Sequence, residues 1–96
     1  MIGVEVTFRY EADFDPDLPR AVAEAAHAQF EGMPGLRSKA FTIDQENRQA
    51  VNFYLWDSEE AARSFFTDEL RDRVTVLYGV APTIQFLEIA ALVDNT

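Results

Sequence analysis

The chain contains no cysteine among its 96 residues. Disulfide bonds, thiolate nucleophiles and thiolate metal sites are therefore excluded. Basic residues are also scarce, because eight Lys and Arg side chains stand against 17 Asp and Glu and leave a formal net charge of −9. This charge repels phosphate backbones and anionic lipid surfaces, so we expect neither nucleic acid nor a membrane as a partner.

Long apolar runs are absent as well. The chain has no stretch of about 18 apolar residues that would suit a membrane-spanning helix. Its N-terminus lacks the basic segment and apolar run that are typical of a secretory signal peptide. We therefore expect a cytoplasmic protein.

The residues that are abundant are those of a packed core. Hydrophobic residues make up 48% of the chain, with eight Phe, three Tyr and one Trp. This length and composition predict one domain covering residues 1–96. A domain of this size buries only about two-thirds of its unfolded surface, so a partner subunit would stabilise it.

Hydrophobic periodicity predicts the order β-α-β-β-α-β. Apolar residues alternate with other residues from Ile2 to Tyr10, which is the period of a strand with one buried face. The second helix is expected to begin at Asp57 or Ser58, with Glu60 completing a capping box from Asp57. The expected elements cover residues 2–10, 18–30, 36–44, 49–56, 58–78 and 83–93.

This order predicts an α+β fold of the ferredoxin-like type, with a four-stranded antiparallel sheet and two helices on one face. The predicted strands at 49–56 and 83–93 carry apolar side chains on both faces. Two helices can cover only one of these faces. We therefore expect a homodimer formed by sheet-on-sheet packing, although a monomer with a few exposed apolar side chains is the alternative.

The third predicted strand carries the most informative side chains. Asn52, Tyr54 and Trp56 alternate along it and therefore share one face, beside a core. Trp56 is equally well explained as a packing residue at the end of the strand, and Tyr54 is more typical of half-buried packing. Asn52 is the stronger indication of a site, because Asn is disfavoured within strands and its amide needs partners when buried.

The element order, the Pro34-Gly35-Leu36 turn and the segment from Tyr54 to Ala61 resemble the dimeric α+β barrel superfamily. Within it, the chain is similar to the short proteins related to antibiotic-biosynthesis monooxygenases. The resemblance covers nearly the whole chain. It implies a small molecule bound between sheet and helices, such as an electron-rich aromatic or polyketide-like substrate. It also implies oxygenation without flavin or metal, because the substrate carbanion reacts with dioxygen directly.

The same resemblance assigns roles to three side chains. It implies that Asn52 donates a hydrogen bond to a substrate oxyanion, that Trp56 stacks on a flat ring, and that Tyr54 orients a hydroxyl or carbonyl group. Asn52 and Trp56 are therefore the candidate catalytic residues, and Tyr54 is a candidate substrate-binding residue.

A general base is harder to identify. His27, the only histidine, lies on the flank of the first helix, where it reaches either a cavity or solvent beside Glu24 and Glu31. Arg9 and Glu5 belong to the polar face of the first strand, where they line the same cavity or pair with residues of a neighbouring strand. His27 and Arg9 are kept as candidate substrate-binding residues.

The sequence argues against two sites that bind haem or a metal ion. In haem-degrading relatives a helix-borne histidine ligates the iron, and the register from Trp56 places Thr75 at that position, so we expect no haem. Asp13, Asp15 and Asp17 alternate as in a calcium loop, but the loop lacks the required Gly and Glu, so we expect no metal. A non-catalytic binding or assembly module and a small isomerase remain as alternatives.

Overall fold

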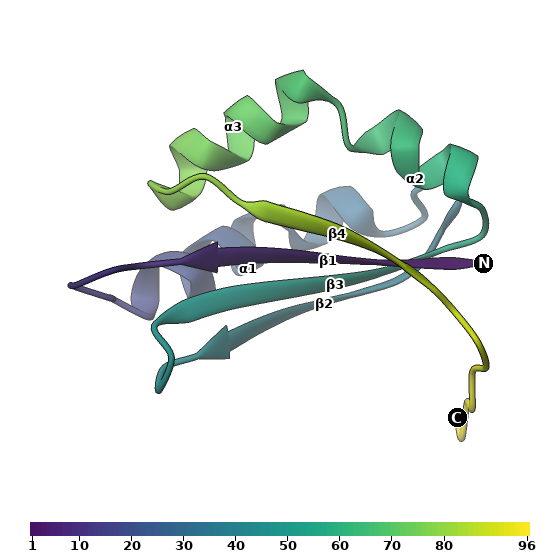
Figure 1. The fold of residues 1–96 in the computed structure, drawn as a ribbon, viewed down its shortest axis with the longest axis horizontal. Coiled ribbons are helices and arrows are strands. Elements are labelled where there is room, and N and C mark those ends of the chain that lie inside the picture. Colours follow the sequence, from purple (N-terminus) through teal and green to yellow (C-terminus); the bar gives the residue numbers. More distant parts are fainter.

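A computed structural model describes all 96 residues of the chain as one sheet with three helices (Figure 1). No helix combines the length and the apolar character that crossing a bilayer requires. The elements are β1 (Ile2–Arg9), α1 (Asp17–Phe30), β2 (Leu36–Asp44), β3 (Gln49–Trp56), α2 (Glu59–Phe65), α3 (Asp68–Tyr78) and β4 (Thr83–Glu88).

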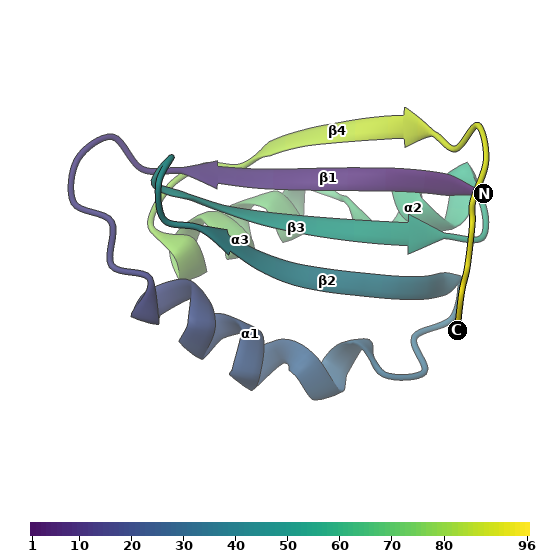
Figure 2. The same ribbon diagram turned by 90° about the horizontal axis from the view of Figure 1, so that it is seen from below.

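The sheet has the strand order β2-β3-β1-β4, and every neighbouring pair is antiparallel. This is the ferredoxin-like topology that the sequence predicts. All three helices lie on one side of the sheet, and the other side is free of helices (Figure 1). In Figure 2, α1 runs along the β2 edge, while α2 and α3 lie behind the remaining strands.

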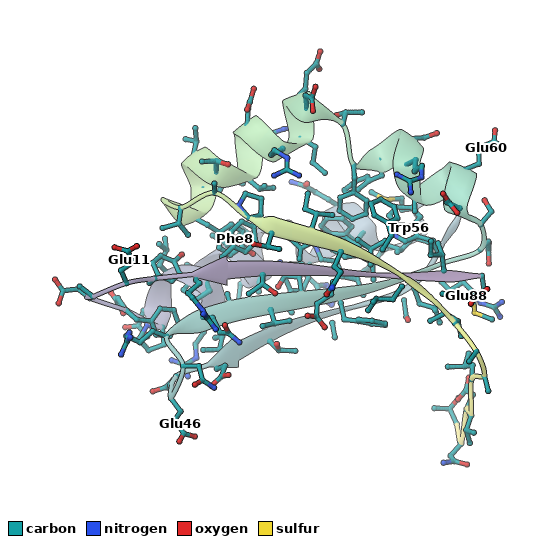
Figure 3. All side chains as sticks on the ribbon, viewed as in Figure 1. Phe8, Glu11, Glu46, Trp56, Glu60 and Glu88 are labelled. Carbon is teal, nitrogen blue, oxygen red and sulfur yellow. The ribbon has the colours of Figure 1, made fainter.

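The core lies between the sheet and the helices. Alternate residues of β1 are buried on this side, and the register places Val6 beside Asn52 of β3 and Ile84 of β4. Phe8 and Trp56 point from the sheet into this layer, whereas Glu60 of α2 points outward (Figure 3). The even positions of β1 and β3 therefore face the helices, as their alternation predicts.

The second helical region differs from the prediction, because it forms two helices instead of one. Phe66 leaves the helical conformation, and the Thr67 hydroxyl accepts a hydrogen bond from the backbone N–H of Leu70 to begin α3. Ser58, not Asp57, caps α2 through a bond from Ala61 N–H, so the predicted box with Glu60 does not form. The break orients Phe65 and Phe66 separately toward the core.

The final strand is also shorter than predicted, since β4 ends at Glu88 and not at Val93. Glu88 pairs with Ile2, which is the first residue of β1, so the following residues have no neighbouring strand to pair with. The chain then turns away from the sheet on the side opposite the helices (Figure 1) and crosses the strand ends toward β2 (Figure 2).

The turn before β2 is fixed to the end of β3. Gly35 has a φ of +82°, a left-handed conformation that favours glycine. Its carbonyl accepts a hydrogen bond of 2.8 Å from the Asp57 backbone N–H. A Cβ atom at Gly35 would lie 2.8 Å from the Ala61 Cβ and 3.8 Å from the Trp56 ring. The Pro34-Gly35-Leu36 motif therefore joins the turn, β3 and α2 into one packed unit.

This contact gives a first prediction. Gly35→Ala should lower the free energy of unfolding by about 2–4 kcal/mol, because a steric clash adds to the backbone strain. Gly32→Ala is the matched control, since Gly32 also has positive φ but open space around it, and it should cost only about 1 kcal/mol. Urea unfolding of the two variants measures the difference. Equal losses would show that Ala61 does not restrict position 35.

Candidate functional site

An open cavity of about 430 Å³ lies between the sheet and the helices. Ligand-binding pockets usually measure about 300–1,000 Å³, so its size suits a small molecule. Its wall is mainly hydrophobic, with a few polar groups from β2, β3 and the helices. The polar and charged residues that line it are Gln29, Lys39, Asn52, Tyr54, Ser64, Thr67, Arg73 and Tyr78.

Asn52 lies in the floor of this cavity on β3. It is the buried polar residue of the core, at 4% exposure. Its Nδ2 donates a hydrogen bond of 3.1 Å to the Tyr78 hydroxyl at the end of α3. The Tyr78 ring stacks on Phe8 with 3.7 Å between ring centroids. Asn52 is therefore held in place by its partner, and its amide oxygen has no hydrogen-bond partner within the chain and is not fully enclosed.

Tyr54 lines the same cavity, two residues along β3. Burial, together with the neighbouring Tyr78, raises the pKa of Tyr54 well above its ordinary value. Burial also raises the pKa of Tyr78, against the opposing effect of its bond to Asn52. Both phenols are therefore neutral near pH 7, and a neutral phenol can donate a hydrogen bond.

Trp56 lies on the same face of β3 as Asn52 and Tyr54 but does not line the cavity. It is 1% exposed and packs against Phe65 and Phe66 at centroid distances of 5.3 and 6.0 Å. Its ring is nearly parallel to that of Tyr54, 6.1 Å away. Its Nε1–H is buried without a hydrogen-bond partner. In this structure Trp56 reaches the cavity only indirectly, through Tyr54 and Phe65, which both line it.

The structure places His27 and Arg9 outside the cavity. His27 lies on the outer flank of α1, where its side chain is 71% exposed and its Nδ1 is 3.0 Å from a carboxylate oxygen of Glu31. Arg9 is at an odd position of β1 and faces the opposite side of the sheet, with its guanidinium 3.4 Å from the side-chain oxygen of Gln49. Strand alternation explains the position of Arg9, since neighbouring residues of a strand point to opposite faces and Phe8 faces the helices.

The sequence interpretation did not identify Lys39, which is the only lysine of the chain. Lys39 lies opposite Tyr54 in the sheet, on the cavity side of β2. Lys39 and Phe41 are two residues apart on β2 and therefore share one face of the strand. The sequence thus already placed a lysine on an apolar strand face. Burial lowers the pKa of Lys39 from 10.5 to about 7.

The sequence comparison decides the family. The family described as "Putative mono-oxygenase ydhR" matches residues 4–84, which is most of the chain. The chain belongs to this family. No curated protein matches the sequence closely enough to count as a relative.

Solved structures agree with the fold of this family. A monooxygenase from Streptomyces coelicolor, the product of ActVA-Orf6 in complex with nanaomycin D, is 24% identical with a TM-score of 0.69, over 98% of this chain and 92% of that one. A mutant of SnoaB, a cofactor-independent oxygenase from Streptomyces nogalater, is 14% identical with a TM-score of 0.68, over 95% and 94%. These similarities establish a shared architecture.

A third structure of this fold is a mutant of MhuD with two manganese protoporphyrin IX molecules bound in each active site. It is 18% identical with a TM-score of 0.67, over 99% of this chain and 100% of that one. At the predicted ligand position, the Thr75 hydroxyl donates a 2.7 Å hydrogen bond to the Arg71 carbonyl within α3. Neither α2 nor α3 contains a histidine or cysteine, so these helices supply no strong ligand for haem iron.

The low pKa of Lys39 gives a second prediction. Between pH 7 and 10.5 the unfolded chain holds a proton that folded Lys39 has lost, so this group makes stability rise with pH. Its contribution changes by at most about 1.4 kcal/mol per pH unit. Lys39→Met should therefore stabilise the fold most below pH 7, and the gain should shrink by pH 9.5.

Urea unfolding at pH 6.5 and 9.5 measures this change. Arg37→Met is the control, because Arg37 is a half-exposed cation on the same strand. A gain that is equal at both pH values would show that Lys39 has an ordinary pKa in the folded chain.

Proposed function

We propose that this protein is a cofactor-independent monooxygenase acting on a small, electron-rich aromatic or polyketide-like substrate in the cavity beside Asn52. The observation that carries this proposal is the position of Asn52. A strand-borne amide is buried, fixed by Tyr78, and placed at the wall of an apolar cavity of ligand size. Membership of a monooxygenase family and a fold shared with a cofactor-independent oxygenase support it.

The reaction can be written for an anthrone, which carries a CH₂ group between two aromatic rings. Loss of one proton gives an enolate, and its carbon adds dioxygen to form a hydroperoxide. Cleavage of the O–O bond, with loss of the second proton, leaves a ketone and releases water. The balance is R₂CH₂ + O₂ → R₂C=O + H₂O, so dioxygen takes the four electrons that the carbon loses and no reductant is consumed.

The protein would accelerate this reaction by binding the substrate and stabilising its anion. A half-turn of the Asn52 amide lets the Tyr78 hydroxyl donate to the amide oxygen and directs the Nδ2 hydrogens into the cavity. One hydrogen bond between the two side chains is kept in both orientations, because a hydroxyl group can donate or accept. Asn52 and the neutral Tyr54 hydroxyl then donate hydrogen bonds to the enolate oxygen, while Phe30 and Phe65 provide apolar walls.

In this proposal Trp56 is a positioning residue. Its ring lies parallel to Tyr54, and it also packs against Phe66 and against Phe65 of the cavity wall. It therefore fixes the Tyr54 ring, and through it the hydroxyl group, without touching the substrate.

The test is oxygen consumption with 1,8-dihydroxyanthrone in air-saturated buffer. We expect turnover above the rate with heat-denatured protein, a 1:1 ratio of oxygen consumed to quinone formed, and no loss after treatment with a chelator. A raised melting temperature with the anthrone but no turnover would instead identify a binding module, since a ligand of the native state stabilises by mass action. Isomerised product without oxygen consumption would identify an isomerase.

We also propose that the chain acts as a homodimer through the helix-free face of its sheet. Val51, Phe53 and Leu87 lie on this face and are only partly covered. The tail after β4 adds Leu92 and Val93, which are 50% and 81% exposed. Apolar surface of this kind is usually covered by another subunit.

A dimer of this form makes a third prediction. Phe53→Glu should shift the protein to monomers, because burying a carboxylate in the interface without a partner is strongly unfavourable. Sedimentation equilibrium measures the mass, and Ala25→Glu on the exposed side of α1 is the control. A monomeric wild-type protein at high micromolar concentration would contradict the proposed assembly.

A further inference from the structure

The Lys39 side chain is surrounded by aromatic rings. Its Nζ lies 3.5 Å from the ring centroid of Phe30, 4.0 Å from that of Phe41 and 4.4 Å from that of Tyr54. These three residues and Lys39 all line the cavity. The only lysine of the chain is therefore placed at the wall where a flat ligand would bind.

This amine has no ionic partner. Its Nζ makes no salt bridge and no hydrogen bond within the chain. Although the chain has 17 carboxylates, none of them lines the cavity, and Arg73 of α3 is the only other cation there. The cavity wall thus carries two basic side chains and no carboxylate, although the protein as a whole is strongly acidic.

Titratable and charged groups surround Lys39 on α1, β2, β3 and α3. On the α1 side, His27 pairs with Glu31, and on β2, Arg37 lies 3.7 Å from Asp57. His27, Glu31 and Arg37 border a groove on the outer side of Lys39. Toward β3 and α3, Lys39 faces the cavity that Tyr54, Tyr78 and Arg73 also line.

Two effects act on the proton of this amine. Burial removes water from the ammonium and lowers its pKa to about 7. The faces of the three rings attract a cation and act in the opposite direction. An amine with such a pKa exchanges its proton near neutral pH, which is the property of an effective general base.

We propose that Lys39 is the acid–base group of this cavity and that the ligand is an acidic phenol or enol. The neutral amine takes the hydroxyl proton of the ligand, which for an anthrone is that of its enol tautomer. An O–H bond breaks, an N–H bond forms, and the electron pair remains on the ligand as the same enolate that loss of the CH₂ proton gives. The resulting ammonium and the ligand anion form an ion pair beside the rings. During oxygenation, this proton would leave with the second oxygen atom in water.

This inference rests on the proposed function for its place in the reaction, but its test needs no oxygenation. Under nitrogen, 1,8-dihydroxyanthrone is titrated with the protein and its ionisation is followed by absorption. At pH 7.5 we expect the anion fraction of the bound probe to exceed that of the free probe at least tenfold. In Lys39→Met the bound probe should ionise like the free probe, whereas Arg73→Met, which removes the other cation, should keep the anion.

A second measurement follows the amine itself. Protein carrying ¹³C at the lysine ε carbon gives one resonance, because the chain has one lysine. At pH 8, saturation with the probe under nitrogen should move this resonance from the neutral-amine position to the ammonium position. A resonance that stays at the neutral-amine position, or one that is already ammonium without the probe at pH 8, overturns the proposal.

The two proposals fail separately. Wild-type protein that ionises the probe under nitrogen but consumes no oxygen in air keeps the role of Lys39 and refutes the monooxygenase. Oxygen consumption with an unchanged rate and pH profile in Lys39→Met refutes the role of Lys39 and leaves the monooxygenase. If the probe does not bind the wild-type protein, the proposed ligand class is refuted.

Discussion

Replacing Asn52 with Ala is expected to lower kcat/KM for oxygen consumption by about two to three orders of magnitude. Removal of one preorganised donor to an oxyanion typically costs a factor of about 10²–10³. Asn52 is the strand-borne amide at the cavity wall, and its bond to Tyr78 holds it before a substrate arrives. The loss should appear mainly in kcat, because the hydrogen bond from Asn52 to the substrate oxygen strengthens as negative charge develops on that oxygen.

The control is Asn47→Ala. Asn47 lies in the β2–β3 hairpin and bonds to the Asp44 carboxylate, away from the cavity. This change should leave oxygen consumption unaltered. Far-UV circular dichroism should show that Asn52→Ala is folded, since losing one buried hydrogen bond costs only about 1–3 kcal/mol. Less than a fivefold loss in kcat/KM in folded Asn52→Ala would remove the main support for the proposed mechanism.

Replacing Trp56 with Ala is expected to lower the free energy of unfolding by about 3–5 kcal/mol. Trp56 is among the largest fully buried side chains and packs between β3, Phe65 and Phe66. Natural domains are typically stable by only about 5–15 kcal/mol, so this loss is a large fraction of the total. Urea unfolding at 25 °C gives the change.

Trp56→Phe separates packing from catalysis. It keeps an aromatic ring beside Tyr54 and removes an Nε1–H that has no partner. The free energy of unfolding should therefore fall by less than about 1.5 kcal/mol. Oxygen consumption should stay within threefold of the wild type, because Trp56 does not line the cavity. A hundredfold loss in a stable Trp56→Phe protein would show that the indole itself contacts the substrate.

The alternation of β1 and β3 shows how much of the fold can be predicted from the sequence. A period of two places every second side chain on one face, and so Ile2, Val4 and Tyr54 had to share the buried side. The Pro34-Gly35 turn and the Ser58 cap could be predicted for the same local reason. The break at Thr67 was missed, although Thr67-Asp68-Glu69 also has the composition of a helix start.

Which side chains reach the cavity depends on packing between elements that are distant in the sequence. Asn52, Tyr54 and Trp56 share a strand face, yet only the first two reach the cavity. The helix break decides this difference, since Phe65 and Phe66 cover Trp56, whereas the space bounded by α1 and α3 remains open beside Asn52.

Local spacing in the sequence by itself determined the element order, the buried strand face and the presence of an amide within a core. It did so because strand and helix periods are properties of the backbone. Tertiary structure alone decided that Lys39, beside Phe41 on β2, also meets the rings of Phe30 and Tyr54. These groups come from three separate elements, and the protonation of the amine depends on the water that their packing removes.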